Sequence, residues 1–307
     1  MLSEGLLGLV LSLAGPAAGA DAKEREARDA AFWQGIVAAH FKVPEGESPA
    51  ALMSEVSGLL ASPDPRLRDT YGYGIAEAWI YREPKLSASD VRALARDWTA
   101  NLRRGIGSKD DDTVFLRSFS ALDLSLVAAL DLKQICLTPS DFAELLDAAL
   151  AYLAAEKDLR AYDPQKGWIH ATAHTADLLK FLARNDKLPE AAQEKIVGAI
   201  EAKLRVADVA FTHGEDERLA SALASLLVRA DAAPDLLVPW LAHLKEAGAE
   251  LWRNEPFVDP AAYRSLQNQE NCLKNLHVIL SVRGMEKPLP SAASAADERI
   301  LEALKGL

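Results

Sequence analysis

The sequence predicts an all-α protein, and three observations support this prediction. After residue 21, apolar residues recur with helical spacing in nearly every segment, and no segment shows sustained alternation of polar and apolar residues. Short loops with proline or glycine separate helices of about 15 to 20 residues. Helix pairs follow one another about every 40 residues, which favours a HEAT-like helical-repeat superhelix of about twelve helices. The alternative is an irregular α/α toroid-like domain.

The N-terminus predicts a signal peptide over residues 1–20. Leu6–Ala14 is an apolar run too short to cross a bilayer, and Ala18-Gly-Ala20 supplies small residues at the spacing that signal peptidase reads. Charged residues then begin at once. We therefore expect cleavage near Ala20, a periplasmic or secreted protein, and one all-helical domain over residues 21–307. No Lys or Arg precedes the apolar run, so a cytoplasmic location is the alternative.

The predicted helices of the N-terminal half have recognisable starts and stops. Proline in the first turn favours a helix start at Ser48-Pro49. Acidic residues are favoured beside the free N–H groups of a helix start, so Asp110–Asp112 opens a strongly apolar helix that we expect at the centre of the fold. The helices are Ala22–His40, Ser48 to the Ser62–Pro65 stop, Arg66–Arg82, Ser87–Asp90 to near Gly105, and Thr113–Leu132.

The C-terminal half continues in the same way. Thr212 and Glu215 have the spacing of a capping box, which places a helix start there. The segments with helical spacing are Thr138 to about Glu156, Gly167 onward, Leu188-Pro189 to Ala210, Gly214 onward, Asp259–Gly284 and Ser294–Leu304.

Composition excludes several classes of function. A net charge of -11 and a pI near 5.1 argue against a nucleic-acid partner. After the leader no stretch reads as a transmembrane helix, and no phosphate loop, nucleophile elbow or dinucleotide fingerprint is present. Cys136 and Cys272 could pair in an exported protein or lie separately in the core, and the sequence does not distinguish these cases.

His170, His174 and Asp177 form the first candidate site. On a helix they share one side, opposite an apolar face that we expect to contain Trp168. Two histidines four residues apart can bind a divalent metal, with Asp as a third ligand. No Glu follows the first His, so the zinc-protease pattern is absent. The alternative is a polar face that forms hydrogen bonds across a helix interface.

A second candidate group follows from the expected packing. In a two-layer stack alternate helices lie side by side and run the same way, about 10 Å apart. The helices that start near Asp110, Gly167, Gly214 and Asp259 then have neighbouring N-termini. That places Asp110–Asp112, His170, His213–Glu217 and Asp259 along one edge.

Arg117 is the third candidate, because an arginine within an apolar helix needs a carboxylate partner. Asp177, Asp216 or Glu217 could supply it. The alternative is a structural salt bridge or a side chain whose head reaches solvent.

Three segments together resemble a bacterial family of unknown function. Val114–Leu122, Gly167–Leu179 and Phe211–Ala220 are similar in order and spacing to motifs of the domain-of-unknown-function family 2785, and the resemblance covers residues 60–285. It implies an all-helical fold and brings no activity or ligand. The positions that recur in the family fall on His170, His174, Asp177, Asp216, Glu217 and Arg218.

Two functional hypotheses follow. The first is an exported helical-repeat binding or scaffold module with a protein or peptide partner. The second is a metal-dependent hydrolase, in which a divalent metal held by His170, His174 and Asp177 activates a water molecule. The candidate binding residues are His170, His174, Asp177, His213, Asp216 and Arg218, and the candidate catalytic residues are Glu217, as a base, and Arg117.

Overall fold

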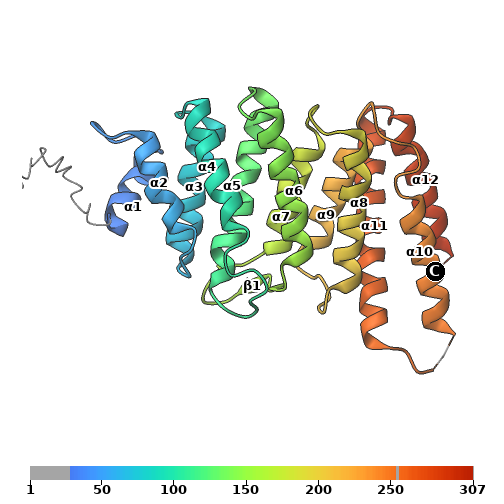
Figure 1. Cartoon of the computed structure of the whole chain (residues 1–307). Coiled ribbons are helices and arrows are strands. Elements are labelled where there is room, and N and C mark those ends of the chain that lie inside the picture. The colour runs from blue at the N-terminus through green and yellow to red at the C-terminus, as the bar shows by residue number, and fades with distance from the viewer. Residues whose placement is uncertain (1–27, 254–255, 307) are drawn as a thin grey trace, which may run out of the picture.

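The computed structural model describes residues 28–253 and 256–306, which form a row of helices and one short β-ladder (Figure 1). The signal peptide predicted over residues 1–20 lies outside the described residues. The all-α prediction is confirmed. The elements are α1 (Ala30–Ala38), α2 (Pro49–Leu59), η1 (Arg66–Tyr73), α3 (Gly74–Ala76), η2 (Glu77–Arg82), α4 (Ala88–Asn101), α5 (Thr113–Lys133), α6 (Pro139–Ala155), β1 (Tyr162–Asp163), β2 (Gly167–Trp168), α7 (Ala171–Ala183), α8 (Glu190–Val206), α9 (Glu215–Leu227), α10 (Val238–Trp252), α11 (Pro260–Glu286) and α12 (Ser291–Lys305).

Alternate helices pack side by side in two layers. α5, α7, α9 and α11 follow one another in one layer, and α4, α6 and α8 form the other. α10 and α12 pack on α11, and α1 and α12 lie at opposite ends of the row (Figure 1). The predicted side-by-side placement of alternate helices is thereby confirmed, whereas the HEAT-like repeat stays a prediction.

α5 is the central helix, as its apolar sequence predicts. Most of its side chains are buried, and it packs against α4, α7, η1 and η2. Within the described residues it alone is long and apolar enough to cross a membrane. Because its neighbours cover it, its apolar character is that of a core helix.

Local signals place several helix starts as the sequence predicts. Ser87 and Asp90 form a reciprocal capping box at α4, and Thr138 and Asp141 form another at α6. At α5 the Asp111 carboxylate accepts the N–H of Thr113 at 2.9 Å. These side chains bind N–H groups that have no partner within the helix.

The capping box predicted for Thr212 and Glu215 is wrong. Gly214, with φ of +86°, occupies the N-cap of α9, and glycine adopts this left-handed conformation without steric cost. Glu215 is therefore the first helical residue. Its Oε2 accepts the N–H of His213 at 2.9 Å and closes the preceding turn instead.

Residues 66–82, predicted as one helix, contain the π-helical segments η1 and η2 on either side of α3. π-helical turns are rare and are often found at functional sites. A Cβ at Gly72 would lie 3.1 Å from Cδ2 of Leu60. The Tyr71-Gly-Tyr-Gly74 run is therefore a place of close packing between helices.

The loops before α5, α7 and α9 meet at one edge of the row, as predicted. Nζ of Lys166, beside β2, lies 2.5 Å from Oδ1 of Asp112. Nζ of Lys109 lies 2.5 Å from Oδ2 of Asp208, in the loop before α9. These ion pairs join loops that are far apart in sequence.

The inclusion of Asp259 in that edge is not supported by the described contacts. Asn268, about two turns into α11, accepts the N–H of Phe211 at 3.0 Å. α11 therefore begins beyond the edge. Asp259 caps its own helix through the N–H of Ala261.

Candidate functional site

His170 occupies the N-cap of α7 in the left-handed region, with φ of 52° and ψ of 32°. Residues other than glycine rarely adopt this conformation, and such strain is concentrated at functional sites. Its Nε2–H donates to the carbonyl oxygen of His213 at 3.1 Å, and its ring stacks on Trp168 with 4.5 Å between centroids. Burial lowers the pKa of His170, although Glu215 opposes this shift. The neutral ring carries its proton on Nε2.

His174 lies one turn further along α7, and its tautomer follows from its neighbour. The Ser118 hydroxyl on α5 donates its only proton to the carbonyl oxygen of Ile169. Nδ1 of His174, 2.8 Å from the same hydroxyl oxygen, must therefore be the donor in that contact. Burial lowers the pKa of His174 well below its ordinary value. The ring is neutral, and its Nε2 lone pair has no hydrogen-bond partner in the described chain.

Asp177 connects α7 to α9. Its Oδ2 accepts a charge-assisted hydrogen bond from the Arg218 guanidinium, and its Oδ1 lies 3.2 Å from Nζ of Lys180. The Asp177 carboxylate is mostly buried, whereas the Arg218 side chain is 40 % exposed. Arg218 therefore keeps N–H groups that face outward from the pair.

The π-helical η1 contributes Asp69 and Tyr73. The carboxylate of Asp69 lies 2.7 Å from the guanidinium of the fully buried Arg68. Burial raises the pKa of Tyr73 to about 12, and the nearby carboxylates of Glu77, Asp123 and Asp177 add to the shift. The phenol is therefore a neutral O–H donor at physiological pH.

These side chains surround one cavity of about 240 Å³ that opens to solvent. Phe119 and Trp168 form aromatic walls, and Trp168 is 41 % exposed at the mouth. The polar lining comes from three elements far apart in sequence, and its residues are Asp69, Tyr73, His170, His174, Asp177 and Arg218.

The expected position of Trp168 on the apolar face of the helix is wrong. The left-handed conformation of His170 starts α7 at Ala171, so Trp168 belongs to β2. Its ring lies against Tyr162 with 4.9 Å between centroids and against His170. Trp168 was expected in the core, and it lies instead at the mouth of the cavity.

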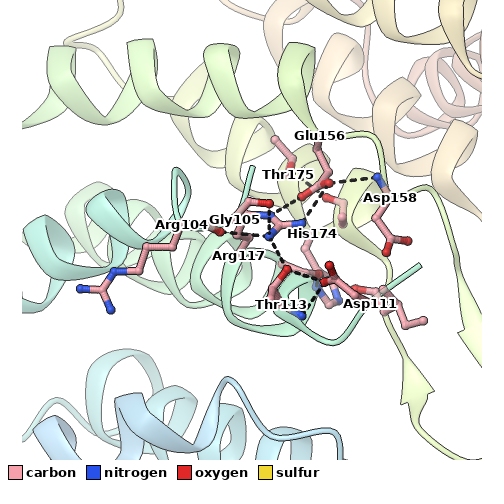
Figure 2. Close-up of polar contacts among 12 residues, drawn as sticks. Arg104, Gly105, Asp111, Thr113, Arg117, Glu156, Asp158, His174 and Thr175 are labelled. Atoms are coloured by element: carbon pink, nitrogen blue, oxygen red, sulfur yellow. Dashed lines mark hydrogen bonds and ion pairs between the residues drawn. The ribbon is translucent and has the colours of Figure 1, made fainter. Parts of the chain in front are cut away.

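Arg117 is not among the residues that line this cavity. Figure 2 shows its side chain surrounded by Glu156, Thr113 and the loop at Arg104 and Gly105. Its guanidinium pairs with Glu156, with 2.7 Å from Nε to Oε2 and 3.2 Å from Nη2 to Oε1. The side chain is fully buried and also donates to the carbonyl oxygens of Arg104 and Gly105. The predicted partners of Arg117 were Asp177, Asp216 or Glu217, and this prediction is wrong. Arg117 instead forms a structural salt bridge, because the end of α6 places Glu156 beside it.

The remaining candidates lie outside the cavity lining. His213 supplies a backbone carbonyl to His170, and its own Nδ1 lies 3.0 Å from Oγ1 of Thr212. Asp216 is buried, and burial raises its pKa. Glu217 is exposed to solvent. In the first turn of α9, only Arg218 lines the cavity. The buried Glu215 lies beside His170, with its Oε1 3.6 Å from Nε2 of the ring.

The expected metal trio is not arranged as a ligand set. Within the described residues, no group of three His, Cys, Asp or Glu side chains is placed to hold a metal ion. Asp177 is bound by two cationic side chains. Nε2 of His170 and Nδ1 of His174 are engaged in hydrogen bonds.

Two polar residues of the cavity lining were missing from the site predicted from the sequence. Asp69 and Tyr73 are four residues apart, and a polar pair at this spacing in an otherwise packed helix is the signal that could have indicated them.

Comparison with known proteins agrees with the resemblance seen in the sequence. A family model described as a protein of unknown function, DUF2785, matches residues 102–278, which is more than half of the chain. No curated protein and no solved structure matches this chain. The match covers α5 to α10 and most of α11, and so includes His170, His174, Asp177 and Arg218. This chain therefore belongs to the DUF2785 family.

Proposed function

We propose that the cavity between η1, α5, α7 and α9 binds a small neutral molecule that carries several hydroxyl groups. The observation that carries the proposal is the Nε2 lone pair of His174. It belongs to a cavity residue and has no partner among the described residues. An acceptor held in this way by Ser118 is ready for an O–H or N–H donor.

The charges around the cavity favour a neutral ligand. Asp69 is paired with Arg68, and Asp177 is paired with Arg218 and Lys180. The histidines are neutral, because burial lowers their pKa values. Each carboxylate that lines the cavity therefore has a cationic partner among the described residues. A hydroxyl group can donate to His174 and also accept from Tyr73 or Arg218, so a polyol matches this mixture of donors and acceptors.

The size of the cavity and its aromatic walls narrow the ligand class. Its volume of about 240 Å³ lies below the range of about 300 to 1,000 Å³ that is typical for drug-sized ligands. A molecule of monosaccharide size is therefore favoured over a protein or peptide segment. Phe119 and Trp168 offer apolar surface to the C–H groups of such a ligand.

Binding is favoured over acid–base catalysis. A general base is most effective when its pKa is near the operating pH. The pKa of His174 lies well below its ordinary value, so the ring accepts hydrogen bonds but is a weak proton carrier. The hydrolase hypothesis has no supporting observation among the described residues.

We also propose that the protein acts outside the cytoplasm. Support comes from the apolar run Leu6–Ala14 and the small residues that end at Ala20. N-terminal sequencing of the protein from cell fractions tests this. A mature chain that starts at Asp21 in the periplasm or medium is expected, and an intact Met1 in the cytoplasm would contradict it.

The binding proposal is tested with a panel of monosaccharides and linear polyols. Ligand-observed NMR identifies binders, and calorimetry measures their affinity. His174→Asn keeps an amide donor for Ser118 but removes the lone pair, and we expect affinity to fall about tenfold. His243→Asn is the matched control, because His243 is half-exposed and pairs with Glu201 on α8.

The outcomes are distinguishable. Binding lost in His174→Asn and in Asp177→Asn but kept in His243→Asn supports the proposal. Equal binding by all three variants, or no binding to the wild-type protein by any polyol in the panel, would overturn it. Circular dichroism of each variant shows whether the fold is retained.

A further inference from the structure

A second cavity, of about 320 Å³, lies between the end of α6, the end of α8 and the loop before α5. It shares no lining residue with the first. Its distinctive feature is Lys203 on α8, which lines this cavity although the residue is only 4 % exposed. Lysine is almost never fully buried unless it is paired.

The described residues satisfy only part of the hydrogen-bonding capacity of the Lys203 ammonium. Nζ donates to the carbonyl oxygen of Glu156 at 2.7 Å, and this is its single hydrogen bond to the described residues. An ammonium has three N–H donors. The carboxylate of Glu156 is already held by Arg117 and by the N–H of Asp158. Two N–H donors of the buried Lys203 ammonium therefore remain available to a ligand in the cavity.

The other charged groups add to the positive character of the cavity. Lys157 at the rim is exposed and makes no ion pair with a described residue, whereas Lys109 is paired with Asp208 at 2.5 Å. The pairs Arg117–Glu156 and Lys109–Asp208 are each neutral, so Lys203 and Lys157 have no counter-charge among the residues that the structure describes. A buried charge without a partner is costly, so an anion here stabilises the folded protein.

The rest of the lining is apolar. Leu159, Val206 and Ala207 line the cavity, and Val206 is 73 % exposed. An inorganic anion would leave this surface uncovered. A carboxylate attached to a short apolar chain or ring would contact both the Lys203 ammonium and the apolar lining.

The geometry points to a binding site for a small organic carboxylate, with its carboxylate on the Lys203 ammonium, Lys157 at the rim and its apolar part against Leu159 and Val206. Burial lowers the pKa of Lys203 to about 8, although Glu156 and Asp208 oppose this shift. A bound carboxylate favours the charged form and raises this pKa again.

The test uses hexanoate as the probe and calorimetry as the measurement, with hexanol and inorganic phosphate as comparison ligands. We expect hexanoate to bind more tightly than either. Lys203→Met removes the ammonium at nearly constant volume and should weaken hexanoate binding about tenfold or more. Lys195→Met, an exposed lysine on the same helix, is the matched control and should leave the affinity unchanged.

Proton uptake gives a readout that a purely structural lysine would not produce. Near pH 8 about half of the Lys203 side chains are uncharged, because the pKa is about 8. Hexanoate binding should then take up as much as about half a proton per site, measured in buffers of different ionisation enthalpy. The uptake should vanish in Lys203→Met. Lys157→Met, an exposed change that spares the fold, should weaken binding about twofold to fivefold.

Four results would overturn the inference. The first two are equal affinity of hexanol and hexanoate, and equal affinity of phosphate and hexanoate. The third is hexanoate binding that is retained in Lys203→Met together with no proton uptake by the wild-type protein. If Lys203→Met does not fold, the Lys157→Met affinity and the wild-type proton uptake decide the question. Absence of hexanoate binding to the wild-type protein also overturns it.

Discussion

The hydroxyl oxygen of Ser118 on α5 lies 2.8 Å from Nδ1 of His174 on α7, and this contact determines which nitrogen of the ring carries the proton. The same hydroxyl is committed as a donor to Ile169. Ser118 in the core thus leaves Nε2 of His174, 56 residues later in the chain, as the acceptor nitrogen of the ring. The contact links the central helix to the cavity that we propose as the binding site.

Ser118→Ala should change the tautomer of His174. The variant removes the acceptor for Nδ1–H and the donor to Ile169, so stability should fall by about 1–3 kcal/mol. Ring ¹⁵N chemical shifts should report an Nδ1-protonated ring in the wild-type protein and a shift toward Nε2 protonation in the variant. Ser140→Ala, at an exposed position on α6, is the control. Unchanged His174 signals in Ser118→Ala would contradict the assignment.

Glu156→Gln should destabilise the protein strongly. It breaks a pair in which both side chains are nearly inaccessible and leaves the Arg117 charge buried, which costs about 3–5 kcal/mol. Replacing both residues, as Arg117→Met with Glu156→Leu, should recover part of this loss. Glu250→Gln breaks an exposed pair with Arg253 and should cost less than about 1 kcal/mol. Urea unfolding measures all three, and equal losses in the two single variants would rule out the buried-pair explanation.

Asp123 predicts a pH dependence of stability. It is fully buried on α5, and neither carboxyl oxygen has a hydrogen-bond partner among the described residues. Burial raises the pKa of Asp123 well above the ordinary value. A raised pKa in the folded state means that the folded protein holds a proton that the unfolded chain releases above about pH 3.9. This contribution to stability is fully present below that pH and is lost as pH rises toward the folded-state pKa.

Asp123→Asn should therefore gain stability relative to the wild-type protein as pH rises. The difference should grow by up to about 1.4 kcal/mol per pH unit between pH 4.5 and 6.5, measured by urea unfolding. Asp123→Leu, which also does not titrate, should show the same pH trend, although its free energy of unfolding should differ from that of Asp123→Asn by a constant amount. A difference that stays constant over this range would show that Asp123 ionises alike in both states.

The two cysteines should be free and unreactive in the folded protein. Both are buried thiols, and burial raises the pKa of Cys136 to about 12. The thiolate is the reactive form, so labelling by iodoacetamide should be slow. Two labels per chain are expected after unfolding without a reductant. A mass lower by two hydrogen atoms in the unreduced protein would instead show a disulfide.

Much of the fold follows from local signals in the sequence. Apolar spacing marks the helices, and the capping boxes at Ser87 and Thr138 set two of their starts. The layer arrangement also follows, because connections this short leave alternate helices side by side. What these signals did not indicate is the left-handed turn at His170, which removes Trp168 from the helix. A left-handed conformation at a histidine is imposed by contacts, not by propensity.

The sequence by itself determined that the chain is all-α, where most helices begin, and that His170, His174 and Asp177 belong to the family's motif. These features depend on residues within one or two turns of each other. Only the tertiary structure decided that Arg117 pairs with Glu156, that Asp69 and Tyr73 join the cavity, and that His174 carries its proton on Nδ1. Each depends on which distant segments meet in the core, and side-chain partners there are chosen by packing geometry that no local pattern encodes.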